Sequence, residues 1–197
     1  LRLRRSASAH RPLPARPAPS RVRAVCPGGG LAGGAADGGG AVISDTDFIT
    51  GLMRENYEAV GFLPEPTIRA RYVQREHYIL QYDERGRVVG YLLHGPLVPG
   101  HVAVVTQHVI ALERRLHGYG AHAVQTLLDR CRQVGVDTIR LHCAEDLPSC
   151  HFWQHQGFRI YRHLSGGTAR QRSILALAYA FPLPLFAPFT ERYDDVC

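Results

Sequence analysis

The stretch that decides the fold is Arg115-Leu116-His117-Gly118-Tyr119-Gly120-Ala121-His122, an R-x-x-G-x-G loop between an apolar strand and an amphipathic helix. Its two glycines let the backbone approach a bound group closely, because glycine has no Cβ and accepts a positive φ. The first N–H groups of the following helix have no partner inside the helix, and together with the helix dipole they favour negative charge. The stretch therefore predicts a site for a pyrophosphate or a similar anion.

The sequence around this loop predicts an α/β sheet with an antiparallel first half and one parallel crossover. Strands are expected over residues 41–43, 77–83, 87–94, 102–110, 137–143, 159–164 and 173–180. Helices are expected from Ser44, over 67–74, over 120–134, and from Pro148 to about Gly157. In the third helix the expected core stripe is Val124, Leu127, Leu128, Cys131 and Val134, and Gly135 is the expected C-terminal cap.

The net positive charge of the chain comes from its first 41 residues. The formal net charge is +6, and residues 42–197 carry equal numbers of arginines and acids, so a basic nucleic-acid-binding surface is not expected on the folded part. Residues 1–40 are rich in Arg, Ala, Pro and Gly and are expected to be a disordered tail, because they cannot bury enough apolar surface. A transit peptide and a plain linker are both open readings of this tail, and so is contact of its arginines with nucleic acid.

The remaining composition bounds the class of protein. No apolar run is long enough for a transmembrane helix, and the five cysteines show no C-x-x-C pattern, which favours reduced thiols and a cytoplasmic location. An organelle is the alternative if residues 1–40 are a transit peptide. His142, Cys143, Cys150 and His151 do not have the spacing of a zinc site, so no metal is expected.

The arrangement resembles the GNAT superfamily of acetyl-CoA-dependent N-acetyltransferases over roughly residues 42–181. The resemblance rests on the R-x-x-G-x-G loop, on Gly118 to His122 opening a helix, and on the segment from Ala144 to Phe158 that ends in Gln156-Gly157-Phe158. It implies a GNAT fold, with a central mixed sheet of six or seven strands flanked by about four helices. The expected domains are the tail (1–40), the acetyltransferase domain (41–181) and a C-terminal extension (182–197).

The resemblance also implies where the co-substrate acetyl-CoA would bind. The pyrophosphate would lie on the backbone of the glycine loop, the pantetheine arm would pair with the strand end at 110–112, and a backbone N–H near there would stabilise the thioester oxygen. The implied binding residues are Ile110, Leu112, Arg115, Leu116, His117, Gly118, Tyr119, Gly120, Ala121, Asp146 and Trp153.

The chain departs from the family where proton transfer would occur. Trp153 occupies the position of the tyrosine acid, and Val104 the position of a strand glutamate that acts as base in one branch. The remaining catalytic candidates are His108, Glu113 and Tyr119, and each has a structural reading as well, namely a core histidine, a surface charge and a packing aromatic. Proton removal through water is a further alternative.

The leading hypothesis is an enzyme that moves an acetyl group from acetyl-CoA to a primary amine. The alternative is a non-catalytic acyl-CoA-binding module, because the usual acid and base are missing. The amine acceptor is left open, although residues 60–75, 95–100 and 165–172 are expected to select it. Arg170 and Arg172 are expected to lie on a solvated strand edge, and contact with an acidic substrate or a CoA phosphate is the alternative. A homodimer through the apolar C-terminal strand is also an expectation.

Overall fold

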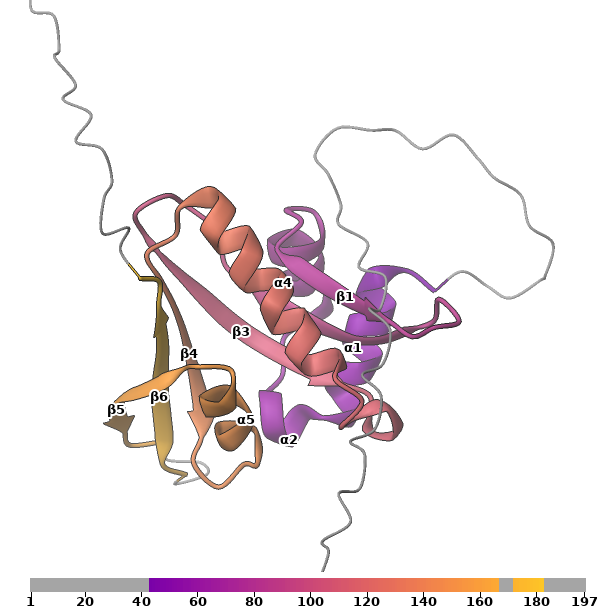
Figure 1. Ribbon diagram of the computed structural model, residues 1–197. Helices are drawn as coiled ribbons and strands as arrows, with labels where there is room; N and C mark the ends of the chain where they lie inside the picture. Colours follow the sequence, from indigo (N-terminus) through magenta and orange to yellow (C-terminus); the bar gives the residue numbers. More distant parts are fainter. Residues whose placement is uncertain (1–42, 167–171, 183–197) are drawn as a thin grey trace, which may run out of the picture.

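Six strands form one mixed sheet in the order β1-β2-β3-β4-β6-β5 (Figure 1). The structure is a computed structural model that describes residues 43–166 and 172–182. The strands are β1 Tyr78–Tyr82, β2 Val88–His94, β3 Val102–Ile110, β4 Thr138–Ala144, β5 Arg159–Leu164 and β6 Ile174–Ala180. The helices are α1 Asp45–Glu55, α2 Tyr57–Val60, α3 Glu65–Ile68, α4 Tyr119–Val134 and α5 Ser149–His155, with a π-helical turn Arg69–Val73 and a 3₁₀ turn Leu112–Arg114. The predicted fold class is confirmed.

The first three strands are antiparallel neighbours, and α4 makes the single parallel crossover, from β3 to β4. The predicted hairpin, helices and later strands appear within a few residues of their expected ends. The predicted first strand at 41–43 is wrong at Ile43, which lies outside any strand with 68 % of its surface exposed. Residues 41–42, the tail 1–40 and all of the extension except residue 182 lie outside the described residues.

Two helix ends have the caps that the sequence predicts. The Ser44 hydroxyl oxygen accepts a hydrogen bond from the Asp47 N–H at the start of α1, and Gly135 ends α4 with φ 82°. The expected core stripe of α4 holds for four residues but not for Val134, which lies in the last turn and is 37 % exposed. Tyr119 and Ala123, near the start of the helix, are buried in addition to the expected residues.

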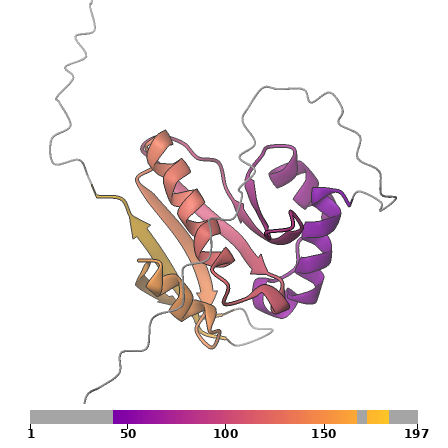
Figure 2. The same ribbon diagram turned by 45° about the vertical axis from the view of Figure 1, so that its right-hand side comes forward.

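The two faces of the sheet carry two separate hydrophobic clusters. Under α4 and α5 lies a cluster that includes Leu127, Ile139 and Trp153, whereas a second cluster under α1 and α3 includes Ile49 and Tyr91. Figures 1 and 2 show α4 across one face and the helices of residues 45–68 on the other. No helix within 43–166 or 172–182 is long and apolar enough to cross a membrane.

A β-bulge in β3 changes the face of the sheet to which the side chains of this strand point. Val105 and Gln107 pair with consecutive residues of β2, so Thr106 is an extra residue without a partner on that strand. Val105 belongs to the cluster under α4, but Val109 belongs to the cluster under α1. A regular strand would place both on one face, so the bulge turns the second half of β3 over.

Beyond the bulge, β3 and β4 separate. The two strands pair in parallel only from Val102 to Val104, opposite Thr138 to Arg140. The following residues of β3 continue along β2, whereas those of β4 continue along β6. The sheet therefore opens into a V between the carboxyl ends of its two central strands, where ligands commonly bind in open α/β sheets.

Candidate active site

The glycine loop presents a row of unused backbone donors. Among the residues that the structure describes, none accepts a hydrogen bond from the N–H groups of 116–121. Gly118 has φ 87°, and a Cβ placed on it would meet no heavy atom within 4 Å. Leu116, also at positive φ, is fully exposed. The loop and the first turn of α4 are thus open and carry unused donors, an arrangement that is suited to an anion.

The side chain of Arg115 turns back toward the protein. Its Nε donates to the Ile110 carbonyl at 3.0 Å and its Nη2 donates to the Asn56 side-chain oxygen at 2.6 Å. Arg115 therefore joins the end of β3 to the C-terminal cap of α1. Its guanidinium anchors the loop, while the backbone of the loop supplies the donors.

The edge of β3 that faces the V has backbone groups that pair with no neighbouring strand. The Ala111 N–H donates to the Val89 carbonyl on β2 at 2.9 Å, so the alternate residues Ile110 and His108 direct their backbone groups away from β2. The bond from Arg115 to the Ile110 carbonyl agrees with this direction. Such an edge can accept one more extended chain, as the expected pantetheine arm requires.

Leu112 is not part of that edge. β3 ends at Ile110, and Leu112 opens the 3₁₀ turn with 74 % of its surface exposed. The expected strand end at 110–112 therefore extends only as far as Ile110, because the chain turns toward the glycine loop.

A cavity of about 100 Å³ lies in the V. Its walls are residues 105–108 of β3, residues 141–143 of β4, Ala59 and Val60 of α2, Leu147, and Ser149 and Trp153 of α5. The residues of β3 and β4 that line the cavity follow the point at which the two strands stop pairing with each other. The separation of the strands thus creates the cavity, at the end of the free β3 edge.

His108 lines this cavity but does not titrate near neutral pH. Its ring lies 5.7 Å from the Phe152 ring and 5.5 Å from the Trp153 ring, measured between centroids. Its Nε2 is buried with no partner among the described residues. Burial lowers the pKa of His108 to about 4, so the ring is neutral at pH 7. The sequence hypothesis of a histidine that titrates near working pH is therefore wrong.

The other two catalytic candidates lie outside the cavity walls. The Tyr119 hydroxyl donates to the Glu84 carboxylate at 2.9 Å, and its ring is 5 % exposed. Burial raises the pKa of Tyr119, and the bond to Glu84 adds to the effect. Glu113 is exposed on the 3₁₀ turn. Tyr119 therefore fastens α4 to the β1–β2 turn, as its packing interpretation predicts.

Trp153 belongs to the core as well as to the cavity wall. It is 6 % exposed and lies 5.1 Å from the Phe158 ring and 5.3 Å from the Phe152 ring, between centroids. Its indole therefore has a structural role, in the position where the resemblance implies an acid. Val104 is 48 % exposed and pairs with Arg140 below the cavity.

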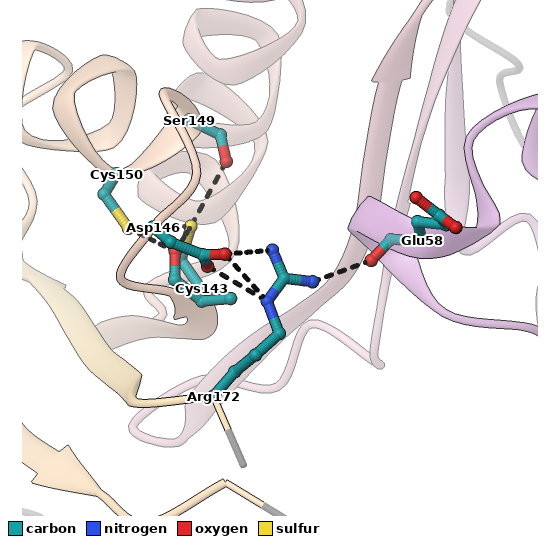
Figure 3. Close-up of polar contacts among 7 residues, drawn as sticks. Glu58, Cys143, Asp146, Ser149, Cys150 and Arg172 are labelled. Carbon is teal, nitrogen blue, oxygen red and sulfur yellow. Dashed lines mark hydrogen bonds and ion pairs between the residues drawn. The ribbon is translucent and has the colours of Figure 1, made fainter. Parts of the chain in front are cut away.

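Asp146 is held by an arginine. Arg172 donates to both carboxylate oxygens of Asp146, and Arg172 Nη1 also donates to the Glu58 carbonyl (Figure 3). The expectation that Arg172 lies on a solvated strand edge is therefore wrong. Arg170 lies outside the described residues. Asp146 does not cap α5, whose first residue follows Pro148 without a side-chain bond.

Two polar contacts of the cavity were not foreseen. The Gln107 amide donates to the Val60 and Gly61 carbonyls and its oxygen accepts from Tyr91. The Tyr72 hydroxyl donates to Thr106 at 3.1 Å. The signal in the sequence was a pair of polar residues, Thr106 and Gln107, inside an otherwise apolar strand.

The cysteines near the V are buried thiols in contact with each other, and they do not form a metal site with the neighbouring histidine. Cys143 Sγ lies 3.0 Å from Cys150 Sγ and 3.2 Å from Ser149 Oγ. His142 is exposed and Cys143 is buried, on opposite faces of β4 as predicted. No group of three metal-binding side chains occurs in the part of the chain that the structure describes.

Comparison with known proteins identifies the fold with one family. Residues 46–158 match the model of the acetyltransferase (GNAT) family. Ard1 from Thermoplasma volcanium is 16 % identical with a TM-score of 0.62, over 71 % of this chain and 93 % of that one. The ribosomal-protein-S18-alanine N-acetyltransferase from Escherichia coli is 15 % identical with a TM-score of 0.57, over 72 % and 92 %.

A third similar structure contains ligands. The spermidine N-acetyltransferase from Vibrio cholerae, in complex with CoA and spermine, is 18 % identical with a TM-score of 0.58, over 69 % of this chain and 89 % of that one. The curated protein sequences contain no match. The family match covers more than half of the chain, and it agrees with the open V and the glycine loop. The chain belongs to the GNAT family of acetyltransferases.

Proposed function

We propose that this acyltransferase moves an acetyl group from acetyl-CoA to a primary amine by direct attack on the thioester. One observation carries the proposal: the cavity in the V lies at the end of the free β3 edge, which leads to the donors of the glycine loop. The cavity is suited to the thioester of acetyl-CoA, the β3 edge to its extended pantetheine arm, and the glycine loop to its pyrophosphate. These three groups follow one another in that order along the molecule.

The backbone would do most of the binding. The N–H groups of 116–121 would hold the pyrophosphate, and the edge at His108 and Ile110 would pair with the pantetheine arm. An N–H of this edge would donate to the thioester oxygen as negative charge grows on it. The amine nitrogen bonds to the acetyl carbon, the carbon–sulfur bond breaks, and CoA leaves as a thiolate that is then protonated.

The proton of the amine needs a separate route. His108 is the only catalytic candidate on the cavity wall, and with a pKa of about 4 it is too weak a base to hold that proton. We infer that the proton leaves through water in the V. The rate should then rise with pH until the acceptor amine itself is deprotonated.

The test combines binding with turnover. Isothermal titration should detect acetyl-CoA, and thiol release should reach steady turnover with at least one primary amine of a panel. Binding without turnover on any amine would favour the non-catalytic acyl-CoA-binding module. A cytoplasmic or organellar location and a homodimer stay predictions.

A single loop variant gives the control. Gly118→Glu places a charged side chain in the open site and should abolish acetyl-CoA binding. Gly100→Glu is the matched variant, because Gly100 also has positive φ and open space but lies before β3. Gly120 is unsuited, since its Cβ would already lie 3.4 Å from the His108 ring. Equal loss of binding in both variants would contradict the assignment.

A further inference from the structure

The side chain of Arg172 joins the two arms of the V. Its Nε and Nη2 donate to the Asp146 carboxylate at 2.8 to 3.0 Å, and its Nη1 donates to the Glu58 carbonyl at 3.0 Å (Figure 3). Asp146 follows β4, whereas Glu58 lies in α2. These two segments stand on opposite sides of the opening between β3 and β4.

This bridge lies next to the cavity. Ala59 and Val60 directly follow Glu58 and line the cavity from α2, while Cys143 and Leu147 flank the Asp146 turn and line it from the other side. The guanidinium therefore spans between two walls of the same cavity.

The Glu58 end of the bridge lies on the side from which the amine would arrive. The glycine loop, α4 and α5 lie on one face of the sheet, whereas α2 lies on the face of α1 (Figures 1 and 2). A thioester held by the glycine loop would enter the V from the α4 face. The attacking amine would then come from the α2 face, where the Arg172 guanidinium donates to the Glu58 carbonyl.

The bridge also fixes the width of that opening. The bond between Arg172 and Asp146 is bidentate, a geometry that limits rotation of both side chains. Beyond Val104, β3 and β4 share no ladder hydrogen bonds that could hold them at one distance. The Arg172 side chain, which is 24 % exposed, thus acts as a spacer between the arms.

We propose that Arg172 is a specificity-determining residue that narrows the α2-side opening, so that the enzyme selects unbranched primary amines. The inference rests on the proposed function and adds the class of acceptor. A straight alkylamine needs only the width of a methylene chain beside the guanidinium. An amine on a branched carbon would have to displace the guanidinium, which would then lose its hydrogen bonds to Asp146 and to the Glu58 carbonyl.

The first test compares acetyl transfer to butylamine and to sec-butylamine, which differ only in branching at the carbon that carries the nitrogen. In Arg172→Ala, kcat/KM for sec-butylamine should rise about tenfold, an ordinary magnitude for discrimination by shape. The value for butylamine should change little. An unchanged ratio between the two amines would overturn the proposal, provided that the melting temperature shows a folded variant.

Two further variants distinguish the effect of the Arg172 bridge from the effect of its positive charge. Arg172→Lys keeps the positive charge, but one ammonium cannot form the bidentate pair and reach Glu58 as well. The ratio of kcat/KM for the two amines should therefore lie between the values of the parent and of Arg172→Ala. Arg132→Ala is the matched control, because Arg132 also pairs with an aspartate but lies at the far end of α4. It should leave the ratio unchanged, and an equal shift in this variant would contradict a specific role of Arg172.

The second test needs no turnover. Cys143 lines the cavity, so its alkylation by N-ethylmaleimide and by the bulkier N-cyclohexylmaleimide reports access to the V. Peptide fragmentation distinguishes Cys143 from Cys150, and CoA is added to block the α4 side. Arg172→Ala should speed the bulky reagent more than the small one, and equal acceleration of both would overturn the proposal. Absence of turnover on every amine would instead contradict the proposed function alone.

Discussion

The His108 ring lies 5.5 Å from the Trp153 ring, between centroids, and both side chains line the cavity between β3 and β4. The pair places an imidazole beside the indole of Trp153, which occupies the position where the resemblance implies an acid. Burial lowers the pKa of His108 to about 4, so the imidazole is neutral at pH 7 and is a weak base there.

The first prediction concerns the role of His108. His108→Phe keeps an aromatic ring against Phe152 and Trp153 and removes a buried nitrogen without a partner among the described residues. We expect kcat to change less than about threefold, whereas loss of a general base costs about 10²–10⁴. Steady-state thiol release at pH 7 measures it. A loss of a hundredfold in a variant that melts like the parent would show that His108 handles the proton.

The second prediction is a loss of stability in mild acid. Burial lowers the pKa of His94 to about 4, as for His108, from the usual 6.5. The unfolded chain therefore binds more protons than the folded chain between these values, and the free energy of unfolding should fall as pH drops from about 6.5 toward 4. Each histidine contributes on the order of 3 kcal/mol at most.

Urea unfolding at a series of pH values measures this slope. His108→Phe should flatten the slope, because it removes one of the two buried histidines whose pKa is lowered to about 4. A slope equal to that of the parent would show that His108 is not a source of the acid sensitivity.

The third prediction concerns Gln107, which joins β3 to the end of α2. Gln107→Leu keeps the size of the side chain but leaves the Tyr91 hydroxyl and the Val60 and Gly61 carbonyls without this partner. We expect a loss of about 1–3 kcal/mol in the free energy of unfolding. Tyr91→Phe in both backgrounds supplies a double-mutant cycle, and strictly additive effects would contradict a shared hydrogen bond.

The fourth prediction concerns the anchor of the glycine loop. Arg115→Ala removes the bonds to the Ile110 carbonyl and Asn56, so the loop is less well positioned. Acetyl-CoA should bind roughly tenfold more weakly, which corresponds to about 1.4 kcal/mol. The emission of Trp153, the single tryptophan of the chain, follows binding because its ring lines the cavity. Unchanged affinity would show that the loop keeps its shape without Arg115.

Much of the fold could be predicted from local patterns. The glycine loop, the caps at Ser44 and Gly135, and the alternation of β4 depend on a few neighbouring residues, and all appear where the sequence places them. The errors occur at element ends. Ile43 and Val134 have apolar side chains but lie where no second layer covers them, and hydrophobicity alone does not reveal that.

The site could be predicted only in part. His108 was recognised as a residue near the strand end, but its burial between Phe152 and Trp153 depends on the packing of α5 against β3. The bulge at Thr106 depends on the pairing with β2 and reverses the faces of β3 beyond it. A pattern of alternating residues within one strand contains neither fact.

The sequence by itself determined the order of the elements and the row of donors at Gly118, because both follow from spacing and from backbone chemistry within a few residues. Only the tertiary structure decided that β3 and β4 separate, that His108 is neutral, and that Arg172 spans the opening to Glu58, 114 residues away along the chain. These features arise when distant segments pack together, and each sets the width or the polarity of a space that no single segment encloses.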